Sequence, residues 1–245
     1  MKPVTKITFF GYNILYGHLK RPICILMIQA TIFDMDGLLI DSEPIWRKAA
    51  QDVLAKIGII LSDEKGKETM GLRVDHLVEY WYHRQPWTGP SCKDVEKEIE
   101  RKVIETVRIN GVPREGVTEA LEFVKGKNVK MAIASSSSME VIHVILEHLR
   151  VEKYFGDLYS AEFEEYGKPH PAVYLTSAKM LDVPVENCLA LEDSFNGLLA
   201  AKAARMKCVC VPDESLRGSA KLGIADIVLP TLAHFNEDIW KQIEG

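Results

Sequence analysis

Short continuous apolar runs alternate with longer amphipathic stretches from residue 29 onward. Each apolar run is typical of a strand buried on both faces, and the runs cover 30–34, 130–135, 158–161, 188–192, 207–211 and 226–229. The amphipathic stretches predict helices, and they cover 118–127, 139–150, 172–181 and 196–206. Ser138 precedes the second of these helices and is expected to cap it with its hydroxyl. The alternation predicts an α/β fold with a doubly wound, mostly parallel sheet.

One long stretch interrupts this alternation, because it carries only helical periodicity. Its apolar positions predict helices over 45–57, over 74–83 and over a last run that contains Val95, Ile99, Val103 and Val107. Ser91 followed by Asp94 is typical of a capped start for this last helix. We therefore expect an all-helical domain over 43–113, inserted into a core formed by 29–42 and 114–245. Because the insert leaves and re-enters the core at neighbouring points, it has the geometry of a hinged lid.

The first 28 residues differ from the rest, because they are both basic and apolar. Gly11 and Gly17 interrupt the apolar stretch well short of the ~20 residues that a membrane span needs. No small-residue pattern typical of a signal-peptide cleavage site follows. We therefore interpret 1–28 as a leader without a catalytic role, outside the fold, and expect the domain proper to begin at Met27.

Composition narrows the class of protein. The chain has 245 residues, of which 47% are hydrophobic and 27% charged, as in ordinary soluble globular proteins. Its formal net charge of −5 and the lack of a dense basic run argue against a nucleic-acid or membrane partner. The cysteines number five and lack metal-type spacing, which indicates a reducing compartment rather than a disulfide framework. We expect a cytoplasmic monomer that binds a small molecule.

Carboxylates directly follow two of the predicted strands. Asp34 and Asp36 come after the first strand, and Glu192 and Asp193 come at the end of the fourth. Open α/β sheets bind ligands at the carboxyl ends of their strands, and paired buried carboxylates are costly unless they meet a cation or another partner. Mg²⁺ prefers oxygen ligands, so Asp34, Asp193 and one backbone carbonyl would supply three positions of a magnesium site. A solvated turn for the first pair and a helix cap for the second are the alternatives.

Groups suited to phosphate follow two other strands. Ser135 ends the strand over 130–135, and Ser136 begins the turn into a helix, where hydroxyl and N–H groups can hold phosphate oxygens. Lys168 lies between Gly167 and Pro169 ahead of a helix, and a rigidly placed lysine suits a phosphate dianion. Turn serines and a solvated lysine are the alternatives. The order of an acidic pair, a hydroxyl, a lysine and a second acidic pair favours one shared site.

These four stretches, in this order and with the helical insert between the first two, resemble the haloacid dehalogenase superfamily from Ala30 to the C-terminus. The resemblance implies a Rossmann-like core with a helical cap and a nucleophilic aspartate, Asp34, that forms an aspartyl-phosphate. It also implies that Asp36 acts as general acid and then as general base. The implied phosphate-binding groups are Ser135, the Ser136 backbone and Lys168, and the implied Mg²⁺ ligands are Asp34, Asp193 and the Asp36 carbonyl. Glu192 is implied as a supporting acid.

Finer features point to a branch of that superfamily. Asp36 argues against the dehalogenase branch, which has no use for an acid there. Mutases similar to beta-phosphoglucomutase carry a histidine where this chain has Trp46. The stretches Phe33–Trp46 (FDMDGLLIDSEPIW), Gly71–Arg73 and Trp81–Trp87 (WYHRQPW) resemble bacterial phosphatases of hexitol 6-phosphates and 2-deoxyglucose 6-phosphate.

That resemblance implies a phosphatase of a small sugar or polyol phosphate. Arg73 and Trp46 are then candidate substrate contacts in the cap, with simple packing of the cap interior as the alternative for the tryptophan. A phosphosugar mutase and a phospho-acceptor signalling or metabolite-binding domain are the alternative functions.

Overall fold

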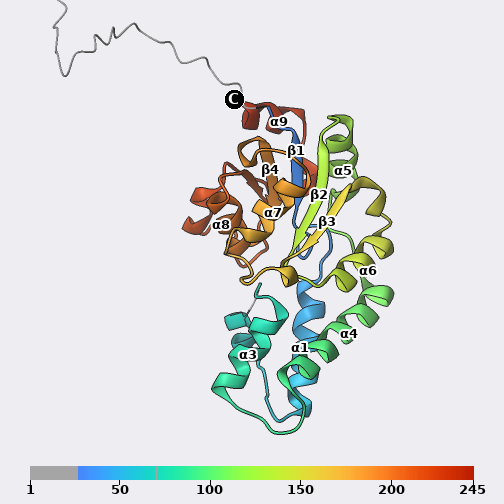
Figure 1. Cartoon of the computed structure of the whole chain (residues 1–245), viewed down its shortest axis with the longest axis vertical. Coiled ribbons are helices and arrows are strands. Elements are labelled where there is room, and N and C mark those ends of the chain that lie inside the picture. Colours follow the sequence, from blue (N-terminus) through green and yellow to red (C-terminus); the bar gives the residue numbers. More distant parts are fainter. Residues whose placement is uncertain (1–26, 70) are drawn as a thin grey trace, which may run out of the picture.

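A computed structural model of the chain describes residues 27–69 and 71–245 (Figure 1). The core is a six-stranded sheet in the order β3-β2-β1-β4-β5-β6. Its strands are β1 (Ala30–Phe33), β2 (Lys130–Ser135), β3 (Asp157–Ser160), β4 (Cys188–Glu192), β5 (Lys207–Cys210) and β6 (Ile227–Val228). The doubly wound α/β fold is confirmed, and every neighbouring pair is parallel. The predicted leader lies outside the described residues, apart from its last two positions.

The strand order places β1 at the centre of the sheet, between β2 and β4. Phe33, the last residue of β1, aligns with Ile133 on one side and with Leu191 on the other. Parallel strands in this register end at the same edge, so the residues that follow them in the chain lie together. This edge is the crevice where doubly wound sheets bind ligands.

Helices cover both faces of the sheet. One hydrophobic cluster joins Phe33, Ile133 and Leu191 to helices α5 (Val117–Gly126), α6 (Met139–Leu149) and α9 (Glu237–Glu244). The other joins Ile32 and Ala190 to helices α7 (Ala172–Met180) and α8 (Phe195–Ala203). Successive strand residues therefore alternate between two apolar faces, and this explains why the strands read as continuous apolar runs.

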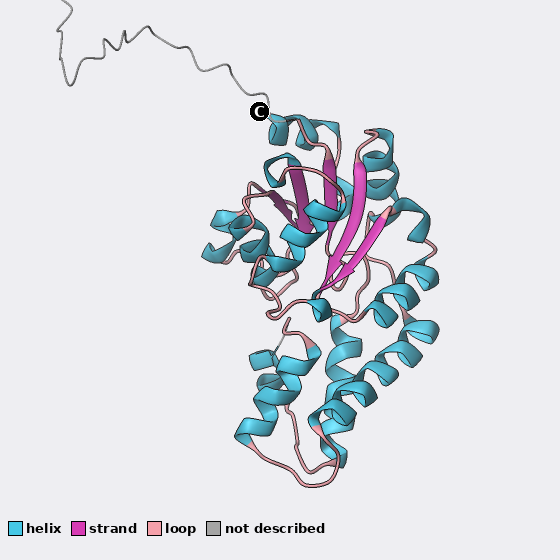
Figure 2. Ribbon diagram, in the orientation of Figure 1, coloured by secondary structure: helices cyan, strands magenta, loops and turns pink. Residues whose placement is uncertain are grey.

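A separate group of helices lies beyond the carboxyl edge of the sheet (Figure 2). It comprises α1 (Glu43–Lys56), α2 (Asp63–Gly66), α3 (Val74–Arg84) and α4 (Cys92–Asn110). We call residues 43–113 the cap. The four-residue repeat of α4 is buried, as predicted, and faces the cap interior with Val53 and Leu54 of α1.

The two connections between cap and core run side by side. Ile40 forms an antiparallel bridge with Pro113, and the Asp41 N–H donates to the Val112 carbonyl at 3.0 Å. The Arg114 N–H donates to the Leu39 carbonyl at 3.0 Å. The neighbouring crossings expected from the sequence are therefore present. That the cap moves as a hinged lid stays a prediction.

Of the two helix caps predicted from the sequence, one is present in the structure and the other is not. Ser91 and Asp94 form a reciprocal capping box at the start of α4. Ser138 occupies the N-cap position of α6, but its hydroxyl accepts no hydrogen bond from the first turn, so that prediction was wrong. The Met139 N–H instead donates to the Glu162 carboxylate at 2.7 Å, a group brought there by a turn after β3.

No helix among residues 27–69 and 71–245 is both long and apolar enough to cross a membrane.

The capping box predicts a measurable contribution to stability. Ser91→Ala removes the hydroxyl that accepts from the Asp94 N–H, and we expect a loss of about 0.5–2 kcal/mol in the free energy of unfolding. Urea denaturation measures it, with Thr88→Ala in the same exposed loop as the control. Equal stability of the two variants would contradict the assignment.

Candidate active site

A cavity of about 470 Å³ lies between the carboxyl edge of the sheet and the cap. It is lined by nearly all of the residues singled out in the sequence, namely Asp34, Asp36, Trp46, Arg73, Ser135, Ser136, Lys168 and Asp193. Glu192 lies behind them, fully buried at the end of β4. The shared edge of the parallel strands therefore brings the four sequence stretches together, and the cap closes over them.

Lys168 links the predicted nucleophile to the supporting acid. Its buried ammonium donates to Asp34 Oδ1 at 2.5 Å, to Glu192 Oε1 at 2.7 Å and to the Ala134 carbonyl at 2.9 Å. The Tyr174 hydroxyl also donates to Glu192 Oε1, at 2.5 Å. All three ammonium hydrogens therefore have acceptors, and the lysine is held between β1, β2 and β4 by a loop ahead of α7.

Burial shapes the charges of this cluster. Desolvation raises the pKa of both Asp34 and Asp193 well above the usual carboxyl range; Lys168 partly offsets this, while Glu192 adds to it. Burial alone would lower the pKa of Lys168, but Asp34 and Glu192 together raise it. In the part of the chain that the structure describes, three buried acidic groups thus lie around the one ammonium of Lys168, an imbalance that a cation would correct.

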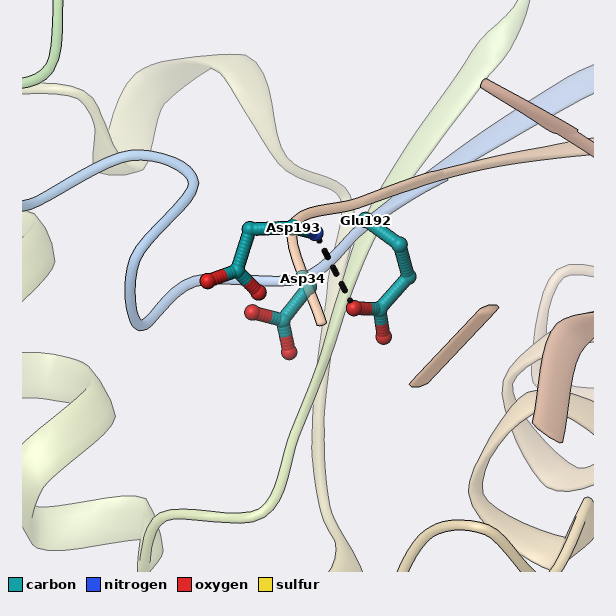
Figure 3. Close-up of side chains that lie close together, drawn as sticks. All are labelled: Asp34, Glu192 and Asp193. Atoms are coloured by element: carbon teal, nitrogen blue, oxygen red, sulfur yellow. Dashed lines mark hydrogen bonds between the residues drawn. The ribbon is translucent and has the colours of Figure 1, made fainter. Parts of the chain in front are cut away.

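The carboxylates of Asp34, Glu192 and Asp193 lie together, with oxygen atoms within 4.8 Å of one another (Figure 3). Glu192 has both oxygens engaged, since Oε1 accepts from Lys168 and Tyr174, and Oε2 accepts from the Asp193 N–H at 3.2 Å. Asp34 and Asp193 are therefore the side chains best placed to hold a divalent cation. Carboxylate oxygens of this kind suit Mg²⁺.

Two glycines leave the space that the carboxylates of Asp193 and Glu192 occupy. Gly37 has a φ of +78°, and a Cβ there would lie 1.9 Å from Asp193 Oδ2. A Cβ on Gly197 would lie 1.8 Å from Glu192 Oε1. A side chain at either position would displace an acidic group, so the turn after β1 and the start of α8 both require glycine.

Asp36 is held by donors from two segments, the start of α1 and the turn at the end of β2. Its Oδ1 accepts from the Ser42 hydroxyl at 2.6 Å and from the Trp46 indole N–H at 2.8 Å. Its Oδ2 accepts from the Ser137 hydroxyl at 2.8 Å and lies 3.4 Å from the Ser135 hydroxyl. Sequence reasoning missed Ser42 and Ser137. The run of four serines after β2 was a signal for Ser137, but nothing in the spacing marked Ser42.

Trp46 was expected either to contact substrate or to pack in the cap. It is half-buried against the hydrophobic core, and its indole nitrogen points at the predicted acid–base group. An indole N–H only donates and cannot accept a proton. Trp46 can therefore orient Asp36 but cannot replace a histidine as a proton acceptor.

Arg73 joins the cap to the core. Its Nε and Nη2 donate to the two oxygens of Asp75 at 2.7 and 2.6 Å. Its Nη1 donates to the backbone carbonyls of Ala161 and Glu164, in the turn after β3, at 2.6 and 2.9 Å. Arg73 lines the cavity, as expected, but its donors are directed to protein acceptors. A substrate contact at this residue stays a prediction, and its observed contacts favour a bridging role.

Comparison with known proteins identifies relatives of the chain. The family model for haloacid dehalogenase-like hydrolases matches residues 31–211. The chain is 41% identical over 206 residues to hexitol phosphatase B of Escherichia coli, which covers 84% of this chain and 93% of that protein. It is 34% identical over 181 residues to the phosphorylated carbohydrates phosphatase of Thermotoga maritima, which covers 72% of this chain and 82% of that protein.

Solved structures show the same fold. CbbY from Rhodobacter sphaeroides in complex with phosphate has a TM-score of 0.79 at 24% identity, with 85% of this chain and 96% of that chain covered. The beta-phosphoglucomutase of Clostridium difficile has a TM-score of 0.77 at 24% identity, with 89% and 97% covered. At this identity the likeness establishes the fold alone.

The raised carboxyl pKa values predict how stability depends on pH. A folded protein that keeps protons on Asp34 and Asp193 binds more protons than its unfolded chain, so its free energy of unfolding falls as pH rises above about 4. Asp193→Asn should therefore raise the stability of the metal-free protein at pH 8 more than at pH 5. Urea denaturation in EDTA measures this, with Glu147→Gln on exposed α6 surface as the control. An Asp193→Asn protein less stable at pH 8 would contradict it.

The Arg73 contacts predict a local effect on dynamics. Arg73→Ala should speed amide hydrogen exchange in α3 and in the turn over 161–164, because hydrogen bonds between cap and core are lost. Arg84→Ala, on the same helix, is the matched control, since Arg84 pairs with Glu68 and lies over the Tyr80 ring, both within the cap. Unchanged exchange over 161–164 in Arg73→Ala would show that the guanidinium does not hold the two parts together.

Proposed function

The chain belongs to the haloacid dehalogenase-like hydrolases, and we propose that it is a Mg²⁺-dependent phosphatase of a small sugar or polyol phosphate, of the hexitol 6-phosphate or 2-deoxyglucose 6-phosphate type. The observation that carries this proposal is the pairing, within one cavity, of Asp34 on a buried lysine with Asp36 on hydroxyl and indole donors. The names of the hexitol and carbohydrate phosphatases support the substrate class.

Asp34 is the nucleophile in this proposal. Lys168 donates to one of its carboxylate oxygens, and the residue lines the cavity. A bond forms between an Asp34 oxygen and phosphorus while the bond from phosphorus to the substrate oxygen breaks. The Ser135 hydroxyl, the Ser136 backbone and Lys168 bind the phosphoryl oxygens and offset their charge.

Asp36 moves the protons. It protonates the departing alkoxide, and as a carboxylate it then takes a proton from the water that attacks phosphorus. The second displacement frees Asp34 and releases inorganic phosphate. Ser42, Trp46 and Ser137 hold the Asp36 carboxyl in one position for both transfers.

The residues present fit a magnesium ion. Asp34, Asp193 and the Asp36 carbonyl would hold it, with Glu192 supporting through its contact with Lys168. Bound there, Mg²⁺ supplies positive charge that offsets the repulsion between the Asp34 carboxylate and the phosphate dianion.

Phosphate release tests the proposal. The wild-type protein should release inorganic phosphate from hexitol 6-phosphates or 2-deoxyglucose 6-phosphate with Mg²⁺, and excess EDTA should abolish the release. Asp34→Asn should abolish turnover, and Asp36→Asn should slow it by roughly 100- to 10,000-fold. Melting curves of both variants check that they fold.

Three results would contradict the proposal. Full activity in EDTA would exclude the metal, and near-normal turnover of Asp34→Asn would exclude the nucleophile. Conversion of a sugar 1-phosphate into its 6-phosphate without phosphate release would favour the mutase.

A further inference from the structure

The proposed reaction fixes where the leaving group lies. Asp36 must contact the oxygen that it protonates, so the carbon chain of the substrate begins beside this carboxylate. The cap segment beside Asp36 is the first turn of α1, since Ser42 and Trp46 both donate to Asp36 Oδ1. The carbons that follow the reacting oxygen therefore meet side chains of this turn.

Two charged side chains near the start of α1 line the same cavity. Glu43 and Arg47 are four residues apart on α1, so they lie on one face of the helix, and both border the space that contains Asp34 and Asp36. Each is half-buried. They are placed to contact whatever extends from the reacting phosphate.

Neither side chain has a hydrogen-bond partner or a close ion pair among residues 27–69 and 71–245, although the two charges influence each other. Arg73 differs, because all of its donors have acceptors there. The Glu43 carboxyl is partly shielded from water, and this desolvation raises its pKa to about 7, although the positive charge of Arg47 partly offsets the rise. Partly desolvated charged groups whose hydrogen-bonding atoms are unengaged can gain from hydrogen bonds that a ligand supplies.

We propose that Glu43 and Arg47 form the subsite for the hydroxyl groups of the substrate, with the carboxylate accepting and the guanidinium donating hydrogen bonds. The inference rests on the proposed function and names the residues that select a polyhydroxylated leaving group.

Steady-state kinetics of Glu43→Gln and Arg47→Met test the subsite. The substrates are sorbitol 6-phosphate, which carries hydroxyls, and para-nitrophenyl phosphate, which has none on its leaving group. We expect the ratio of kcat/KM for sorbitol 6-phosphate to that for para-nitrophenyl phosphate to fall roughly ten- to a hundredfold in each variant. Arg47→Lys, which keeps the charge, should recover part of the loss.

Matched controls lie on the same helix. Asp52→Asn and Lys48→Met change exposed charges of α1 that pair with each other outside the cavity, and both should keep the wild-type ratio. Melting curves check folding, and each of the two subsite positions tests the inference on its own.

The outcomes separate the two proposals. Equal losses on both substrates, or no loss, in variants of a wild type that hydrolyses sorbitol 6-phosphate would overturn the subsite and leave the proposed function standing. A wild type that hydrolyses para-nitrophenyl phosphate but no sugar or polyol phosphate would overturn the proposed function, and the inference with it.

Discussion

The site depends on the ion pairs that the buried ammonium of Lys168 forms with two carboxylates. Its side chain is 4% exposed, and it pairs with Asp34 at the end of β1 and with Glu192 at the end of β4. Removing one partner of such a buried group typically costs about 3–5 kcal/mol, because the remaining charge is left uncompensated. Lys168 thus makes it possible to keep acidic groups buried at the end of two central strands. The remaining negative charge makes the site receptive to a cation.

The cap completes the site as well as covering it. Asp36 belongs to the core, yet two of its donors, Ser42 and Trp46, lie where the chain enters the cap. Arg73 fixes a second point of the cap to the turn after β3. The orientation of the proposed acid–base group and the position of the cap are therefore physically coupled. The indole N–H of Trp46 contributes to this coupling by donating to Asp36, and because it cannot accept a proton it adds no second base to the site.

The sequence alone determined the layers of the fold and the main chemical groups of the site. Strands buried on both faces must be apolar throughout, so Ala30–Phe33 and Cys188–Glu192 stood out from the amphipathic helices. Parallel strands end at one edge, so Asp34, Ser135 and Asp193 could be expected to meet. The capping box of α4 was readable because its partners are three residues apart. The strand runs and the capping box are local sequence patterns, and the meeting of the three side chains follows from the parallel direction of the strands.

Only the tertiary structure decided which groups surround Asp36 and which line the distal cavity. Ser137 is 101 residues away from Asp36 in the chain, so their contact depends on the pairing of β1 with β2. Arg73 is 88 residues away from Ala161, so that contact depends on how the cap packs on the core. The start of α6 shows the same dependence, because its first N–H, that of Met139, donates to Glu162 from another element, while the Ser138 hydroxyl caps no N–H of the first turn. Local pattern specifies elements and their ends, whereas the partners of a polar side chain are set by whichever distant groups the fold brings within hydrogen-bond distance.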